Sequence, residues 1–289
     1  MYDRYQQALI WLESLGITVG SGRLQNYDRT IAYWKDAYAT ASENEGKEIF
    51  PEFMGAMFEV HDIIDIYEAF KDETPSNLAH VIEKLKLAVT GPVNLHEETT
   101  TSTKARNFLF EAVVDARMHN PQAGIRTILN ATSDSGFQVG SKKVWIECKR
   151  VTRLSKIEKN VKKASSQLES LFEQSTGTGH RGIVALEVSK IFHAGDQLLV
   201  QKDDENLNRA LNEKMDKFIA ENARIWESIY QKRNKKIIGT LLRFSFMAVS
   251  EQRNLAVHAS QWGMNPRTTV SASDQSLMKN FVSLLVRRI

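Results

Sequence analysis

The chain has 289 residues, of which 42% are hydrophobic and 25% are charged, as is ordinary for a globular protein with a sizeable core. Its longest apolar runs are far shorter than the ~20 residues that a membrane helix needs, and its first residues lack a signal peptide's basic and apolar regions, so we expect a cytoplasmic protein with no membrane partner. The only cysteine, Cys148, excludes an internal disulfide and a thiolate zinc site, so any bound metal must have oxygen or imidazole ligands.

The charge is unevenly distributed along the chain. Residues 1–100 carry 8 Lys and Arg against 17 Asp and Glu, a net charge of −9, whereas residues 101–289 carry 30 against 18, a net charge of +12. This asymmetry is consistent with a polyanion that binds the C-terminal two thirds. Two differently solvated surfaces would explain the charge alone equally well.

The N-terminal part has the pattern of a small helical bundle. Apolar periodicity and helix-ending signals predict helices over residues 3–15, over residues 26–42, from Pro51 onward, and over residues 77–89. Tyr27, Ile31, Trp34 and Tyr38 fall on one face of the second helix, which favours a core position for them. We therefore predict an acidic all-α domain over residues 1–95. Gly91-Pro92 and the polar stretch 94–103 mark its boundary with a second domain over residues 100–289.

The second domain begins with an amphipathic helix over residues 104–119, which ends before Pro121. Strands are then predicted over residues 125–131, 137–139 and 144–151, the last two joined as a hairpin around Gly140. A basic helix over residues 155–174 and an apolar strand over residues 183–188 follow. Beyond them we expect a helix over residues 205–232, strands over residues 241–249 and 255–260, and a helix over residues 274–287.

Acidic and basic side chains converge on the predicted hairpin. Because side chains alternate along a strand, Glu147 and Lys149 share one face of strand 144–151. Asp134 precedes the hairpin, so the returning chain brings Glu147 near it. A carboxylate on so apolar a strand needs a partner, and hard oxygen ligands suit Mg²⁺ or Mn²⁺. The same acid-x-lysine triplet at Glu45-Gly46-Lys47 lacks this context; a solvated pair of Glu147 and Lys149 is the simpler alternative.

Two further residues fit this cluster: Glu111 lies on the preceding predicted helix and Gln167 on the following one. The resulting pattern resembles the PD-(D/E)XK nuclease superfamily, in the order Glu111 … Asp134 … Glu147-Cys148-Lys149 … Gln167. The resemblance covers roughly residues 104–189. It implies a restriction-endonuclease-like α-β-β-β-α-β core with a mixed sheet, and divalent-metal hydrolysis of phosphodiesters, usually in DNA. Ser133 stands where the family has a proline. Leu171 replaces a tyrosine of the exonuclease-like branch, which favours an endonuclease.

The resemblance also implies roles for individual residues. Asp134, Glu147 and the backbone carbonyl of Cys148 would hold the metal, Mg²⁺ or Mn²⁺, and Lys149 would orient or deprotonate the attacking water. Glu111 would support the metal through water, although Asp115 lies one turn away on nearly the same face and could take that role. Gln167 would complete the catalytic set.

Basic residues are densest beside this motif. Between residues 142 and 163 there are nine basic residues against two acidic ones. A solvated basic face would explain such a run, but its position next to the motif favours phosphate contacts. The expected nucleic-acid contacts are Lys142, Lys143, Arg150, Arg153, Lys156, Lys159 and Lys163.

The sequence thus predicts a metal-dependent DNA endonuclease, with RNA left open as substrate and an N-terminal domain that binds a protein partner, mediates dimerisation or controls access. A homodimer is expected by analogy, because cleavage of both strands usually calls for two active sites. A role in restriction or anti-phage defence is consistent with the superfamily. The alternative is a catalytically inactive nuclease-like module that binds nucleic acid or protein.

Overall fold

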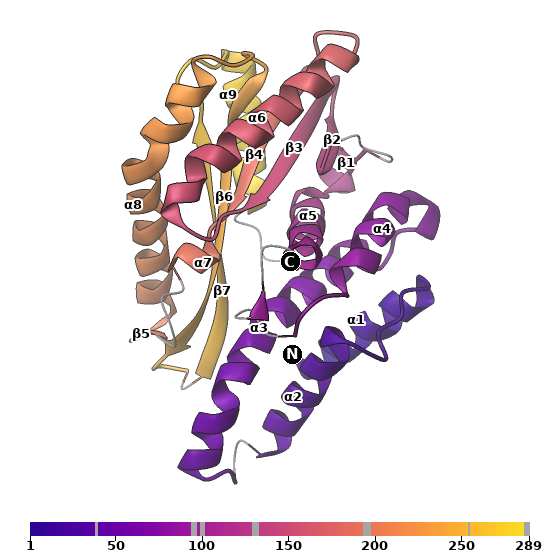
Figure 1. Ribbon diagram of the computed structural model, residues 1–289, viewed down its shortest axis with the longest axis vertical. Coiled ribbons are helices and arrows are strands. Elements are labelled where there is room, and N and C mark those ends of the chain that lie inside the picture. The colour runs from indigo at the N-terminus through magenta and orange to yellow at the C-terminus, as the bar shows by residue number, and fades with distance from the viewer. Residues whose placement is uncertain are drawn as a thin grey trace. The chain divides into compact units, whose positions relative to one another are not determined.

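The computed structural model shows an α/β protein with a mixed sheet preceded by helices (Figure 1). It describes residues 1–37, 40–93, 97–98, 102–128, 133–192, 198–253 and 255–285. By their internal contacts the residues form two compact units that divide between Ala116 and Arg117. In the described ranges, no helix has the length and apolar character needed to cross a membrane.

The first unit consists of helices, as its sequence pattern predicts. Their bounds are α1 Tyr2–Ser14, α2 Arg23–Ala37, α3 Glu43–Phe70, the 3-10 helix η1 Pro75–Leu78, α4 Ala79–Ala88 and α5 Lys104–Met118, whose last two residues fall in the second unit. On α2, Tyr27 and Ile31 are buried, as the stripe predicts, and Trp34 packs on Phe53 of α3. Tyr38, the last member of the stripe, lies outside the described residues.

One prediction for this unit is wrong, because α3 begins at Glu43 rather than at Pro51. Ser42 and Glu45 form a capping box, in which each side chain bonds the backbone N–H of the other residue, and this fixes the start eight residues earlier. Pro51 then lies inside the helix. A proline removes only one helical hydrogen bond, and the long apolar face of α3 compensates for that loss.

The division between the units differs from the expected domain boundary. The sequence places the boundary at residues 94–103, of which 94–96 and 99–101 lie outside the described residues. Most of α5 belongs with the N-terminal helices, since Arg106 pairs with Glu59 of α3 and Asp115 with Lys84 of α4. The expected opening helix of the second domain is therefore largely part of the first unit.

The second unit is built on a seven-stranded sheet, counted over the described residues. Its order is β1-β2-β3-β4-β6-β5, with β7 paired to the other edge of β6. Strand β2 is antiparallel to both of its neighbours, β1 and β3. Strands β3, β4, β6 and β5 run parallel, and β7 is antiparallel to β6. The bounds are β1 Ile125–Thr127, β2 Ser135–Val139, β3 Lys142–Arg150, β4 His180–Glu187, β5 Leu199–Gln201, β6 Ile237–Ser250 and β7 Leu255–Pro266.

Two long helices pack on one face of this sheet, α6 Ile157–Gln174 and α8 Asp204–Tyr230. Figure 1 shows α6 crossing the strands and α8 beside them. Trp145 and Val151 of the β3 segment join the apolar core under α6, as strand alternation predicts, together with Val184 and Leu186 of β4. The short helices η3 Pro121–Ala123, η4 Leu154–Lys156 and α7 Ser189–Phe192 are connections, and α9 Ala272–Leu285 packs on β7.

The predicted hairpin is confirmed, with Val139 opposite Lys142 across the two-residue turn Gly140-Ser141. Gly140 has a positive φ of 57°, a conformation that glycine adopts without steric cost. Strand 125–131 is described only as far as Ile128, with β1 ending at Thr127, and residues 286–287 of the expected last helix lie outside the described residues. The sequence missed β5 and α7, which are too short to show a period.

Candidate functional site

The site is built where the β2–β3 ladder ends. The last antiparallel pair is Ser135 with Ile146, so the backbone of β3 beyond it has no β2 partner. Asp134, the residue before β2, uses its side chain instead, and its Oδ2 accepts the N–H of Cys148 at 2.8 Å. The carboxylate is thereby held beside the part of β3 that carries Glu147 and Lys149.

The ammonium of Lys149 lies at the centre of this cluster. Its Nζ donates to Asp134 Oδ2 at 3.0 Å, to Glu147 Oε2 at 3.1 Å and to the Cys148 carbonyl at 2.9 Å. Three oxygens, two of them on carboxylates, thus surround one positive charge. The structure brings together the three central residues of the sequence prediction, and the backbone oxygen predicted to accompany them.

The cluster lies in a largely water-excluded environment. The side chain of Glu147 is 4% exposed, that of Lys149 13% and that of Asp134 23%. Burial, and then the neighbouring Asp134 carboxylate, raise the pKa of Glu147 to about 7, although Lys149 acts in the opposite direction. Burial tends to lower the pKa of Lys149, but Asp134 and Glu147 more than offset it, so that this pKa lies above its ordinary value.

The geometry fits a small hard cation. Asp134, Glu147 and the Cys148 carbonyl are oxygen donors that already converge on a positive charge. Within the described ranges, no three His, Cys, Asp or Glu side chains group together as a metal cage. An ion bound here would therefore complete its coordination with water and substrate oxygens, as Mg²⁺ commonly does.

The other predicted catalytic residues lie on α5 and α6. Glu111 is buried on α5 in the first unit, whereas the cluster belongs to the second. Asp115, the alternative helix acid, is fully buried and bonds Lys84 at 2.7 Å, with His80 at 3.5 Å. Gln167 is exposed on α6, and in the described part of the chain no hydrogen bond joins it to the cluster. Asp115 therefore has a structural role within its own unit.

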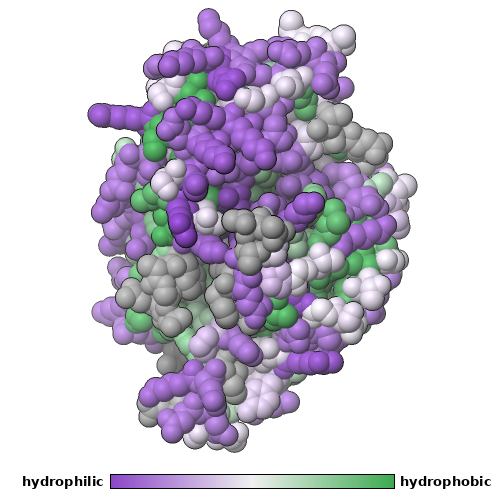
Figure 2. Space-filling model, in the orientation of Figure 1, coloured by the Kyte–Doolittle hydropathy of each residue, from purple (hydrophilic) through white to green (hydrophobic). Residues whose placement is uncertain are grey.

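An exposed group of basic side chains follows the cluster along the chain. Arg153, Lys156, Lys159 and Lys163 are all exposed, over η4 and the first half of α6. A helix N-terminus carries a partial positive charge, so lysines gain nothing from the helix dipole there. An anionic partner would relieve this repulsion. The face that carries α6 is largely hydrophilic in Figure 2.

Two of the predicted phosphate contacts are engaged elsewhere, while Lys143 is exposed at the start of β3. The side chain of Arg150 is 9% exposed, and its Nε lies 3.4 Å from Glu187 of β4. Lys142 donates to Asp274 and Ser273 at the start of α9, each at 2.8 Å. Composition alone could not separate these residues from the exposed ones, because their acidic partners are remote in sequence.

Sequence reasoning missed the fixed position of His180. Trp145 donates its Nε1–H to His180 Nδ1 at 2.9 Å, and His180 Nε2 lies 2.9 Å from the Thr176 carbonyl. Both ring nitrogens are thus satisfied, and the ring stacks on Trp145, two residues before Glu147 on β3. Trp145 and His180 become neighbours only through the parallel register of β3 and β4. That register cannot be read from the sequence alone.

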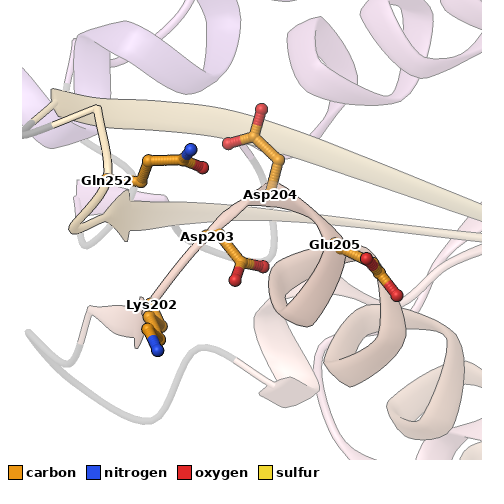
Figure 3. A pocket seen from close by; sticks show the side chains of 5 residues that line it. All are labelled: Lys202, Asp203, Asp204, Glu205 and Gln252. Carbon is orange, nitrogen blue, oxygen red and sulfur yellow. The ribbon is translucent and has the colours of Figure 1, made fainter.

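A hollow of about 420 Å³ lies at the start of α8, away from these residues (Figure 3), lined by Lys202, Asp203, Asp204, Glu205 and Gln252. Its acidic groups have local partners. Asp203 caps α8 by accepting the N–H of Asn206 at 2.8 Å, and Glu205 pairs with Arg209. These acidic groups therefore serve the N-terminal end of α8, and the hollow carries no argument for a ligand site.

Comparison of the chain with protein-family models, with curated proteins and with solved structures finds no significant match.

Proposed function

We propose that the protein is a Mg²⁺- or Mn²⁺-dependent endonuclease that hydrolyses phosphodiester bonds in DNA. The observation that carries the proposal is the convergence of Asp134 Oδ2, Glu147 Oε2 and the Cys148 carbonyl on one cation, the Lys149 ammonium, within 2.9–3.1 Å. A buried carboxylate, Glu147, next to the half-buried carboxylate of Asp134 is unfavourable unless a positive charge is present. Beside a bound metal ion, the Lys149 ammonium would add a second positive charge where a phosphate would approach.

The topology around the cluster supports a restriction-endonuclease-like core. Taken in order, α5, β1, β2, β3, α6 and β4 follow the sequence helix, three strands, helix, strand. The antiparallel β1-β2-β3 arrangement continues into a parallel β3–β4 pair, and α6 packs over both strands. This is the mixed-sheet arrangement that the resemblance implies.

The residues present divide the chemistry between them. Asp134 and Glu147 would hold the cation together with the Cys148 carbonyl, and the N–H of Cys148 keeps the Asp134 carboxylate in position. When bound, such an ion would neutralise charge on a phosphate and lower the pKa of its water. The Lys149 ammonium would orient the attacking water, and the Arg153, Lys156, Lys159 and Lys163 side chains would bind flanking phosphates.

The charge pattern supports a nucleic acid as substrate. A net charge of +12 over residues 101–289 favours a polyanion, while the acidic first hundred residues would repel one. The N-terminal helices would then serve contacts with a protein partner or with a second copy of the chain. We propose a homodimer, because one active site cuts one strand; light scattering of the purified protein tests this.

The decisive experiment measures cleavage of plasmid, single-stranded DNA and RNA, with Mg²⁺, with Mn²⁺ and with EDTA. Wild-type protein is expected to cut DNA only with a metal ion. The variants D134N, E147Q and K149M should each lose at least a hundredfold in rate. K217M and E158Q remove an exposed lysine of α8 and an exposed glutamate of α6 and should retain near wild-type rates.

Different outcomes separate the proposal from its alternative. RNA cleavage alone would change the substrate class and leave the site in place. A folded wild-type protein that binds DNA but cuts no nucleic acid under any condition would instead identify a nuclease-like binding module. Equal cleavage by wild type and the three cluster variants would contradict the assignment of the site.

A further inference from the structure

We propose that Lys149 is a placeholder cation: its ammonium neutralises the two carboxylates of the empty site, and a divalent ion must displace it to bind. This inference rests on the proposed function and concerns how the same site is loaded. It follows from a single arrangement, in which Lys149 Nζ contacts Asp134 Oδ2, Glu147 Oε2 and the Cys148 carbonyl at once.

The distances make the two cations mutually exclusive. The ammonium lies 2.9–3.1 Å from each of the three oxygens. Mg²⁺ binds oxygen at about 2.0–2.1 Å. An ion bound by the same three oxygens, on the side where the ammonium lies, would overlap with Nζ. Two positive charges cannot share that position, so binding of the ion requires the lysine to move.

The burial of the cluster explains why an internal cation is useful. Glu147 and Asp134 would repel one another in a site with little water, and burial of an unpaired carboxylate is costly. Lys149 lowers that cost without any ligand. Its side chain is 13% exposed and has four flexible methylenes, so an outward rotation toward solvent is open to it.

Displacement would couple loading of the site to its chemistry. In the metal-free arrangement all three protons of the ammonium have acceptors, at Asp134, Glu147 and Cys148. The lysine is then unavailable to a water molecule or a phosphate. If these three oxygens held an ion, the ammonium would be released from them. The lysine would thus become available only in the loaded protein.

The first test measures the affinity of Mn²⁺ for the full-length protein by calorimetry, without nucleic acid. K149M removes the competing charge, so we expect its Kd to be about tenfold lower than that of wild type. Its thermal midpoint without metal should fall, and added Mn²⁺ should raise that midpoint more than in wild type. K217M, which changes an exposed lysine of α8, should match wild type in both measurements.

A second readout uses the wild-type protein itself and so does not depend on how the variant folds. Amine acylation followed by mass spectrometry should show Lys149 protected without metal and several-fold more reactive at saturating Mn²⁺. Lys143 serves as the internal standard and should label equally in both states.

The outcomes distinguish this inference from the proposed function. If wild type binds Mn²⁺ but K149M binds it equally or more weakly, and Lys149 stays protected on loading, the placeholder role is wrong while the metal site stands. If no folded form of the protein binds a divalent ion, the proposed function falls and the placeholder role falls with it.

Discussion

The Asp134 carboxylate accepts the backbone N–H of Cys148 at 2.8 Å, at the point where β2 stops pairing with β3. One side chain therefore extends the hydrogen-bonding pattern of the sheet and also presents an anion to Lys149. These two functions have different chemical requirements. The backbone bond needs only an acceptor oxygen, whereas the cation needs a negative charge.

The first prediction separates these functions by two substitutions. Asp134→Asn keeps an acceptor oxygen for the Cys148 N–H, so its free energy of unfolding should stay within about 1 kcal/mol of wild type. Asp134→Ala removes the acceptor as well, and should cost a further ~1–2 kcal/mol. Both should lose Mn²⁺ binding in calorimetry. Wild-type Mn²⁺ affinity in D134N would contradict a role for the charge.

The second prediction concerns Glu147, whose ionised form is unfavourable in the metal-free protein. Its pKa is raised from 4.5 to about 7, so the proton it retains on folding adds stability below pH 4.5, and that stability is lost as the pH rises through 7. Glu147→Gln should therefore be more stable than metal-free wild type at pH 8, by at most about 3 kcal/mol. The gain should shrink as the pH falls toward 4.5.

Denaturant titrations at pH 5 and pH 8, with EDTA, measure this difference. The same variant should gain no stability from Mn²⁺, whereas wild type should gain it. Glu158→Gln, at an exposed position on α6, is the control and should show no pH-dependent gain. If E147Q were less stable than metal-free wild type at pH 8, the Lys149 interaction would outweigh the cost of burying Glu147.

The sequence predicted the centre of the site because local rules determine it. The two-residue turn at Gly140 and the alternation along β3 suffice to bring Asp134, Glu147 and Lys149 together. It could not assign Arg150, whose partner Glu187 becomes its neighbour only through the parallel β3–β4 register. The start of α3 was mispredicted because proline is common in the first turn of a helix, whereas the capping box at Ser42 sets the actual start.

The third prediction concerns the exposed basic residues and the dependence of DNA affinity on salt. Arg153, Lys156 and Lys159 are exposed, so each substitution by Gln should lower the slope of log K against log salt by about 1. Stability should change little. Arg150→Gln should instead lower the free energy of unfolding by about 3 kcal/mol or more, because it leaves the buried Glu187 carboxylate without its partner.

Fluorescence anisotropy with a labelled duplex at several salt concentrations measures the slope, with EDTA present to prevent cleavage. Lys217→Gln, an exposed change on α8, provides the control and should leave the slope unchanged. An unchanged slope in all three basic variants would place the nucleic acid on another surface.

The fourth prediction concerns the stability of the N-terminal helices in mild acid. Burial, and then the positive charges of Arg4 and the amino terminus, lower the pKa of His61 on α3 to about 4. An unfolded chain binds this proton near pH 6.5, so the neutral ring's contribution is present above pH 6.5 and is lost as the pH falls toward 4. His61→Gln should remove roughly 2 kcal/mol of this pH dependence, as measured by denaturation between pH 7 and pH 4. If the free energy of unfolding fell equally with pH in both proteins, groups other than His61 would account for the acid sensitivity.

The last prediction concerns Asp115, a buried acid of α5. Asp115 is fully buried against Lys84 at 2.7 Å, and this pair holds α5 to α4. Asp115→Asn leaves the ammonium of Lys84 without its counter-charge, which should cost about 3–5 kcal/mol of folding stability. Mn²⁺ affinity, measured where the variant is still folded, should be unchanged. Loss of Mn²⁺ binding in a stable D115N protein would contradict a purely structural role for Asp115.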